Sequence, residues 1–211
     1  SIIISLIVPD IVSLLPLLYF LIIVFVSILN NQLDNIFNNI CMTLFGSIWI
    51  IFTLTHFLLF KTVENGTGLL ILIGFSVAIA DICAFCFGKI FYLLNIGITY
   101  TIADRISPHK TYTGTLGNMV GAVLGVLVFA SLNAQISLNM LVYLGICIGI
   151  SSVLGDLSES MIKRFSEVKD SSDSIPGHGG FLDRLDSLFI VIIVCYYFIV
   201  VSHIKIIFSF F

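Results

Sequence analysis

Residues 69–92 read LLILIGFSVAIADICAFCFGKIFY, and the only charged side chains in this run are those of Asp81 and Lys89. A helix that crosses a membrane needs about 20 predominantly apolar residues in succession. The run therefore predicts a transmembrane helix. A carboxylate inside such a helix costs several kcal/mol unless it is paired or faces a polar cavity, so Asp81 marks a candidate functional site, although a structural role near the membrane interface is the alternative.

The rest of the chain has the same character. Its 211 residues are 59% hydrophobic and only 10% charged, and the mean hydropathy is +1.16. Soluble domains carry about 25% charged residues, and disordered chains combine low hydrophobicity with high net charge. The composition thus excludes both classes. The net charge of −3 gives no indication of a nucleic-acid partner.

These observations predict an all-α fold, a polytopic transmembrane helix bundle of about six or seven spans in which residues 1–211 form a single integral membrane domain. Two polar segments, 95–115 and 156–186, separate the later spans and are the expected catalytic loops. The predicted spans are 11–29, 40–60, 69–92, 116–131, 138–155 and 187–208.

Two residue types refine this topology. Gly117, Gly121 and Gly125 in the fourth span are typical of closely packed helices. Seven of the nine Lys and Arg residues fall on the side of the two polar segments. Because cytoplasmic loops are enriched in basic residues, we expect both segments to be cytoplasmic in a multi-pass membrane protein. A bacterial inner membrane is the expected location, with an organellar inner membrane as the alternative. We interpret the five cysteines, all in apolar runs, as buried and unreactive.

The segment from Asp156 to Asp186 has the highest concentration of charged residues in the chain. Asp156 and Lys163 recur at helical spacing and share one face at the end of the fifth span, while Asp183 and Asp186 open the sixth. Carboxylates at these two ends can converge, and Mg²⁺ is bound by one or two carboxylates together with substrate phosphates. The glycines of Pro-Gly-His-Gly-Gly, residues 176–180, allow backbone amides to approach a phosphate closely. Three basic side chains, those of Lys163, Arg164 and Lys169, can bind phosphate oxygens.

The same segment resembles the signature of the phosphatidate cytidylyltransferases, or CDP-diacylglycerol synthases. That signature reads S-x-apolar-K-R, four residues, K-D, then P-x-H-G-G-x-x-D-R-x-D, and residues 160–186 match each fixed position. Residues 81–89 are similar to the family's D-x-G-A-Y-x-x-G-[KR] segment, with Cys83 for Gly and Phe85 for Tyr. Residues 107–114 are similar to its S-P-K-K-T-x-E-G loop, with His109 for Lys and Thr113 for Glu. Residues 75–190 thus resemble the catalytic core of the family.

The resemblance implies a nucleotidyltransferase of phospholipid biosynthesis that converts CTP and phosphatidate into CDP-diacylglycerol and pyrophosphate. The resemblance implies Mg²⁺ as the cofactor, with room for a second, monovalent cation such as K⁺. It also implies contact with membrane lipids, and it leaves open whether the protein forms a homodimer. The expected catalytic residues are Asp156, Lys163, Asp183 and Asp186, and the three aspartates are the expected metal ligands. The expected substrate-binding residues are Asp81, Ser107, Lys110, Thr111, Arg164, Lys169, His178, Gly179, Gly180 and Arg184.

Two other functions stay open at this point. A CTP-dependent kinase of a polyprenol or another lipid would use similar phosphate-binding residues but would transfer the γ-phosphate. A non-enzymatic ion transporter would use Asp81 and Asp156 as coordinating acids, although transporters usually hold such sites near the membrane midplane. His178 is either a phosphate donor or an ordinary turn residue. The crowding of charge at one end of the spans favours chemistry on the loops.

Overall fold

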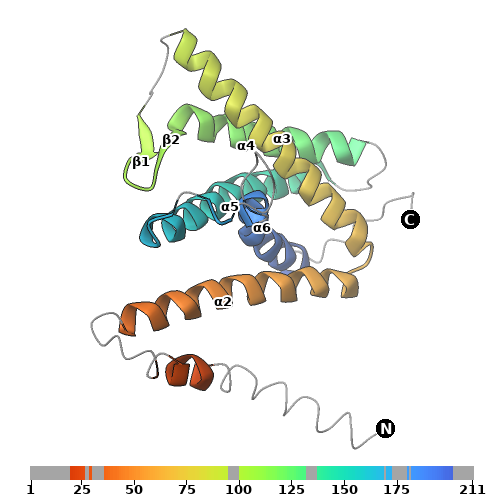
Figure 1. Cartoon of the computed structure of the whole chain (residues 1–211). Coiled ribbons are helices and arrows are strands. Elements are labelled where there is room, and N and C mark those ends of the chain that lie inside the picture. Colours follow the sequence, from red (N-terminus) through yellow and green to blue (C-terminus); the bar gives the residue numbers. More distant parts are fainter. Residues whose placement is uncertain are drawn as a thin grey trace, which may run out of the picture. The chain divides into compact units, whose positions relative to one another are not determined.

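The computed structural model describes residues 20–26, 29, 36–94, 100–131, 137–168, 170–172, 180 and 182–201 (Figure 1). The chain divides into two compact units, residues 1–51 and 52–211, each of which is considered by itself. The described elements are α2 (Ile36–Leu59), η2 (Phe60–Thr62), α3 (Gly66–Leu93), β1 (Thr101–Ala103), β2 (Ser107–Thr111), α4 (Tyr112–Ser131), α5 (Leu138–Phe165) and α6 (Leu182–Val201).

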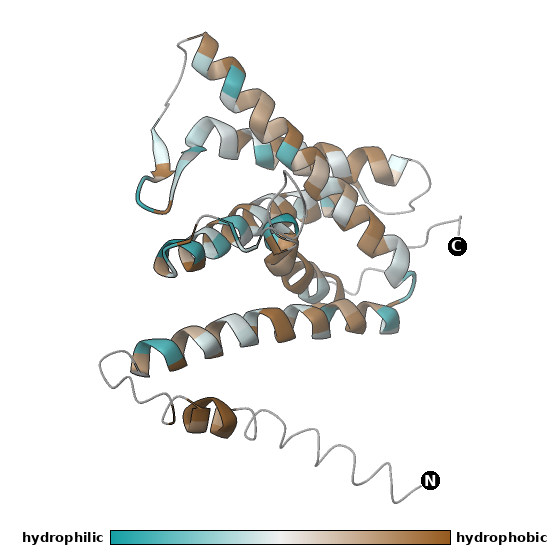
Figure 2. Cartoon of the chain, in the orientation of Figure 1, coloured by the Kyte–Doolittle hydropathy of each residue, from teal (hydrophilic) through white to brown (hydrophobic). Residues whose placement is uncertain are grey.

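Five helices are long and apolar enough to cross a membrane, and together they confirm the predicted all-α, polytopic membrane fold. They correspond to the second to sixth predicted spans. The first predicted span, 11–29, lies mostly outside the described residues, as does the predicted end of the last span beyond Val201. Figure 2 shows that these helices are mainly hydrophobic and that hydrophilic residues gather on the hairpin of β1 and β2 and at the end of α5.

The first unit contributes the beginning of α2. Large apolar side chains are exposed along it, including Phe37 and Ile48. Exposed apolar side chains on a helix of this length are expected where lipid, and not water, surrounds the chain.

In the second unit, α3 and α4 pack closely because α4 presents glycine every fourth residue. A Cβ atom added at Gly121 would lie 2.6 Å from Cβ of Cys83, and one added at Gly125 would lie 2.7 Å from Cα of Ser76. Atoms at these separations overlap, so only glycine allows the two backbones to approach this far. The close packing predicted from the glycine spacing is confirmed.

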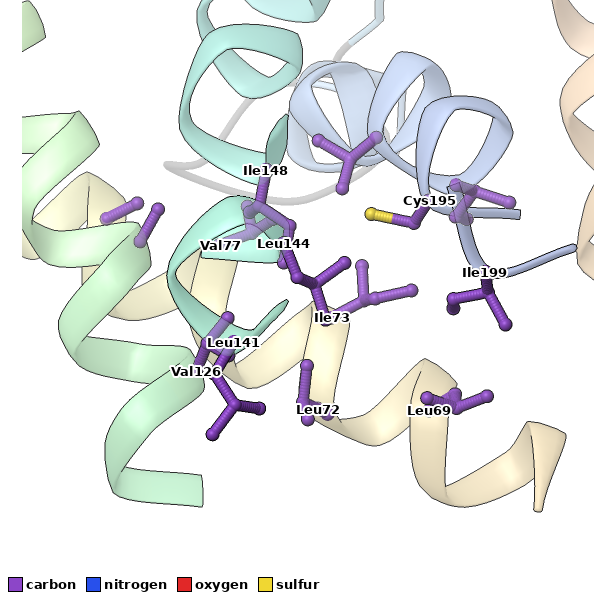
Figure 3. Close-up of a cluster of buried hydrophobic side chains, with 14 of the residues drawn as sticks. Leu69, Leu72, Ile73, Val77, Val126, Leu141, Leu144, Ile148, Cys195 and Ile199 are labelled. Carbon is purple, nitrogen blue, oxygen red and sulfur yellow. The ribbon is translucent and has the colours of Figure 1, made fainter. Parts of the chain in front are cut away.

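The core of the second unit lies between α3, α4, α5 and α6 (Figure 3). Leu72 and Ile73 of α3 meet Leu144 and Ile148 of α5, and Cys195 of α6 is fully buried beside them. The prediction that all five cysteines are buried is wrong, because Cys41 and Cys86 are exposed and Cys83 and Cys147 are only partly buried.

The polar ends of these helices meet at one end of the second unit. β1 and β2 form a two-stranded antiparallel hairpin, with Thr101 opposite Thr111, where the sequence predicts only a polar loop. Oγ1 of Thr111 accepts a hydrogen bond from the backbone N–H of Gly114 at 3.1 Å and so caps the start of α4. Nε of Arg164, near the end of α5, donates to the carbonyl oxygen of Ile106 in the hairpin turn at 3.3 Å. The two predicted catalytic segments therefore lie at the same end of the bundle.

Candidate active site

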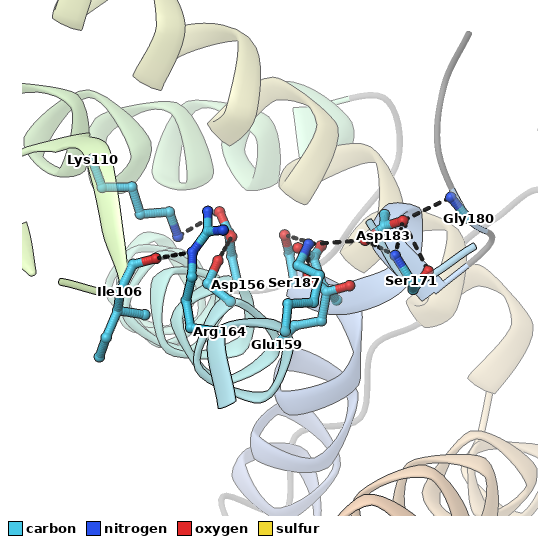
Figure 4. Close-up of polar contacts among 12 residues, drawn as sticks. Ile106, Lys110, Asp156, Glu159, Arg164, Ser171, Gly180, Asp183 and Ser187 are labelled. Atoms are coloured by element: carbon cyan, nitrogen blue, oxygen red, sulfur yellow. Dashed lines mark hydrogen bonds and ion pairs between the residues drawn. The ribbon is translucent and has the colours of Figure 1, made fainter. Parts of the chain in front are cut away.

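Three helices bring carboxylates together at this end of the bundle. The charges of Asp81 on α3, Asp156 on α5 and Asp186 on α6 interact with one another, and Lys110 of β2 contributes the opposing charge. Lys110 forms an ion pair with Asp156 (Figure 4). We call Asp81, Asp156 and Asp186 the acidic centre.

Glycine again permits this convergence. A Cβ atom added at Gly155 would lie 2.6 Å from the carbonyl oxygen of Asp186 and 2.9 Å from that of Ser187. The backbones of α5 and α6 therefore touch beside the acidic centre, which positions Asp156 and Asp186 from neighbouring helices.

Asn118 of α4 links the acidic centre to α5. Its Nδ2 lies 3.5 Å from Oδ1 of Asp81 and 3.4 Å from Oγ of Ser152. Asn118 is 5% exposed, and its Oδ1 has no hydrogen-bond partner among the described residues. The site thus holds a buried acceptor that is available to a bound group.

A cavity of about 630 Å³ opens beside these residues. Its volume lies within the range of ligand pockets, about 300–1,000 Å³. Both acids and bases line it, so it suits a ligand that carries phosphates together with a cation. The polar lining residues include Asp81, Lys89, Lys110, Asn118, Ser152 and Asp156.

Lys163 belongs to a second, adjacent network. Its Nζ lies 2.5 Å from Oε2 of Glu159 and 2.9 Å from Oδ1 of Asp183. Asp183 also accepts hydrogen bonds from the backbone N–H and hydroxyl of Ser171, at 3.0 and 2.8 Å, and from the backbone N–H of Gly180 at 2.7 Å. Glu159 is fully buried. We call Glu159, Lys163 and Asp183 the loop clamp, because they join α5 and α6 to both described ends of the segment 170–180.

The predicted metal ligands are divided between these two networks. Asp156 and Asp186 belong to the acidic centre, whereas the carboxylate of Asp183 is engaged within the loop clamp. Among the described residues, no three His, Cys, Asp or Glu side chains are placed to hold one metal ion. Because Mg²⁺ takes as few as one or two protein carboxylates when phosphates and water complete its shell, the donor set of the acidic centre fits this ion. The ligand set itself stays a prediction.

The remaining predicted site residues are distributed as follows. Asp81, Lys110 and Thr111 line the cavity. Ser107 lies in β2, Arg164 contacts the hairpin turn, Arg184 lies in the first turn of α6, and Gly180 is buried against the loop clamp. Lys169, His178 and Gly179 lie outside the described residues.

Four residues of the site were not among the site residues predicted from the sequence. Glu159 lies one turn before Lys163, and its position would have followed from extending the fifth helix to Phe165. Asn118 and Ser152 are polar residues within apolar spans, which is a usable signal. Lys89 lines the cavity from the last turns of α3.

Comparison with known proteins places these features in a family. The profile of the cytidylyltransferase family matches residues 2–202. The uncharacterized protein YnbB of Escherichia coli is 32% identical over 190 residues, which are 88% of this chain and 62% of that protein. A phosphatidate cytidylyltransferase of Synechocystis is 44% identical over 137 residues, covering 64% of this chain and 44% of that protein.

A phosphatidate cytidylyltransferase of Haemophilus influenzae is 37% identical over 129 residues, covering 59% of this chain and 43% of that protein. The chain spans less than two thirds of the length of each of these relatives. The resemblance inferred from residues 160–186 is confirmed, since the family match extends over almost the whole sequence. This chain, with its acidic centre and loop clamp, belongs to the cytidylyltransferase family.

Proposed function

We propose that this protein is a phosphatidate cytidylyltransferase, which forms CDP-diacylglycerol and pyrophosphate from CTP and phosphatidate. The observation that carries the proposal is the convergence of Asp81, Lys110 and Asp156 on one cavity at the polar end of an apolar helix bundle. Asp186 of the acidic centre lies near these carboxylates but does not line the cavity. At this position, where apolar spans end in polar segments, we expect the cavity to receive a nucleotide from water and a lipid from the bilayer. The names of the relatives from Synechocystis and Haemophilus support the same activity.

In the proposed reaction, a phosphate oxygen of phosphatidate attacks the α-phosphorus of CTP. The new P–O bond forms as the bond from the α-phosphorus to the bridging oxygen breaks, and pyrophosphate leaves with that oxygen and its electron pair. Phosphoryl-type transfers depend mainly on positioning and on stabilising negative charge. The task of this chain is therefore to orient two phosphate groups and to offset their charge.

We propose that Asp156 and Asp186, with Asp81 beside them, hold Mg²⁺ and leave room for a second, monovalent cation such as K⁺. The bound cation would neutralise charge on the triphosphate and on the departing pyrophosphate. Lys110 offsets the charge of Asp156 within the pocket. The loop clamp keeps Gly180, and with it the end of the glycine-rich segment, fixed to α6.

The protein is a multi-pass membrane protein, and we propose that it lies in a bacterial inner membrane with this site at the cytoplasmic face. The basic residues support this orientation. Arg105, Lys110, Lys163 and Arg164 all belong to the end of the bundle that carries the site.

The products formed from CTP test the proposal against its two alternatives. We expect purified protein in phosphatidate-containing micelles to release pyrophosphate from CTP in a reaction that needs both lipid and Mg²⁺. A lipid kinase would form CDP and no pyrophosphate, and an ion transporter would consume no CTP.

A further inference from the structure

We propose that Lys89 binds the phosphate of the lipid substrate at a mouth of the cavity that faces the bilayer. We define the lateral mouth as Phe85, Lys89 and Tyr92, which line the cavity from α3. This inference rests on the proposed function, and it adds the position and the residue that recognise the lipid.

The lateral mouth is one continuous patch of α3. Phe85 lies four residues before Lys89, and Tyr92 lies three residues after it, so the three side chains share a helix face. Phe85 is 69% exposed and Tyr92 is 71% exposed. Residues that both line a cavity and remain exposed lie where the cavity meets its surroundings. Because α3 is long and apolar enough to span a membrane, we expect these two exposed rings to face lipid.

Lys89 is placed for an anionic lipid headgroup. It lies in the last two turns of α3, which ends at Leu93, so its charge falls near the membrane interface, where lipid phosphates lie. Its Nζ is 5.8 Å from the centre of the Phe85 ring, a cation–π contact that holds the ammonium over the mouth.

The two lysines of the cavity have different partners. Lys110 is paired with Asp156 of the acidic centre, whereas Lys89 forms no ion pair within the part of the chain that the structure describes. Eight residues of helix separate Lys89 from Asp81, which is about 12 Å along the axis. Lys89 and the carboxylates of Asp81 and Asp156 nevertheless line one cavity. Lys89 thus binds the lipid phosphate at the mouth, a cation in the acidic centre binds the nucleotide phosphates, and the lipid phosphate meets the α-phosphorus of CTP between them.

The test measures lipid binding directly, without turnover. Thermal unfolding of the purified full chain is followed in neutral detergent with dioleoyl phosphatidate, dioleoyl phosphatidylcholine, CTP or inorganic phosphate. We expect phosphatidate to raise the melting temperature of the unmodified protein, of Lys89→Arg and of Lys61→Met, but not of Lys89→Met. Lys61 is the matched control because it is exposed in η2, before α3 begins.

Kinetics then separate the lipid from the nucleotide. Lys89→Met should raise the KM for phosphatidate about tenfold or more, as expected for a lost charged hydrogen bond, and should leave the KM for CTP within about twofold. The inference is overturned if phosphatidate stabilises Lys89→Met as it does the unmodified protein. It is also overturned if Lys89→Met loses only the stabilisation by CTP or inorganic phosphate. The unmodified protein could also be stabilised by phosphatidate, lose this stabilisation in Lys89→Met, and yet form no CDP-diacylglycerol from CTP. That result would refute the proposed function but support the lipid site.

Discussion

The ammonium of Lys163 donates a hydrogen bond to Oδ1 of Asp183 at 2.9 Å while it also pairs with the fully buried carboxylate of Glu159. Lys163 therefore joins two helices, because Glu159 lies on α5 and Asp183 on α6. Since Asp183 in turn binds Ser171 and Gly180, we expect removal of Lys163 to affect both the helix packing and the positions of these two residues.

We expect Lys163→Ala to lose most activity and to unfold at a lower temperature, although it still inserts into the membrane. Removing one partner of a buried ion pair leaves the other charge without compensation and costs about 3–5 kcal/mol. Glu159 would be left in this state. Lys163→Arg should restore activity only in part, because a planar guanidinium does not replace a compact ammonium. Thermal unfolding and turnover of the three proteins provide the measurement.

A double substitution tests whether the uncompensated charge of Glu159 causes this loss of stability. Glu159→Gln combined with Lys163→Met removes both charges, so the melting temperature should recover toward that of the unmodified protein while activity stays low. A double variant no more stable than Lys163→Ala would show that the pairing of Glu159 with Lys163 does not set the stability of this region.

The acidic centre and the loop clamp should respond differently to Mg²⁺. A cation that binds only the folded state raises the melting temperature by mass action. We expect Mg²⁺ to stabilise the unmodified protein and Asp183→Asn, but to stabilise Asp186→Asn much less. Both variants should lose turnover, the first through the loop clamp and the second through the cation.

Asp173→Asn is the control, because the family signature leaves position 173 variable. This variant should keep both its turnover and the rise in melting temperature that Mg²⁺ causes. A large loss of Mg²⁺ stabilisation in Asp183→Asn would instead support the ligand set predicted from the sequence, which includes Asp183.

Two glycines test the helix packing behind the site, because one is tightly packed against a neighbouring helix and the other has open space beside it. A Cβ atom at Gly121 would lie 2.6 Å from Cys83, whereas one at Gly74 would meet nothing within 4 Å. Gly121→Ala should destabilise the protein by about 1–3 kcal/mol through overpacking. It should also lower activity, because Gly121 lies one turn after Asn118. Gly74→Ala should be neutral or slightly stabilising, since alanine favours helix over glycine by about 1 kcal/mol.

Much of the fold could be predicted because local patterns determine it. Hydropathy identified the second to sixth spans, and the spacing of Gly117, Gly121 and Gly125 indicated the α3–α4 packing. The helix ends were less predictable: α5 continues to Phe165 and α6 begins at Leu182, past the points where hydropathy falls. The polar side chains at the end of α5 and the start of α6 pair with each other. A hydropathy average over neighbouring residues does not reveal such a contact between helices.

The partners within the site could not be predicted for a related reason. Helical spacing places Asp156 and Lys163 on one face, but the pairing of Lys110 with Asp156 depends on how the hairpin folds over α5. β1 and β2 have only three and five residues, so the alternation of apolar and polar residues that identifies a strand is too short to be recognised. The roles of Asp183 and Glu159 likewise follow from contacts between helices.

Topology provides a further prediction. The hydrogen bond from Arg164 to Ile106 places the β1–β2 hairpin and the end of α5 together. Single cysteines at Asp104 and Ser172, in a variant without the native cysteines, should therefore react with an impermeant maleimide from the same side of the membrane. A cysteine at Lys61, at the other end of α3, should react from the opposite side. Labelling of Asp104 and Ser172 from different sides would contradict the shared site.

The most direct measurement follows two labels from CTP into lipid. Purified protein with phosphatidate and Mg²⁺ is supplied with CTP labelled with ³²P at either the α- or the γ-phosphate. If the acidic centre supports cytidylyl transfer, the α-label should enter the lipid fraction, the γ-label should appear in pyrophosphate, and Asp186→Asn should abolish both. Entry of the γ-label into lipid would contradict the proposed reaction and identify a kinase instead.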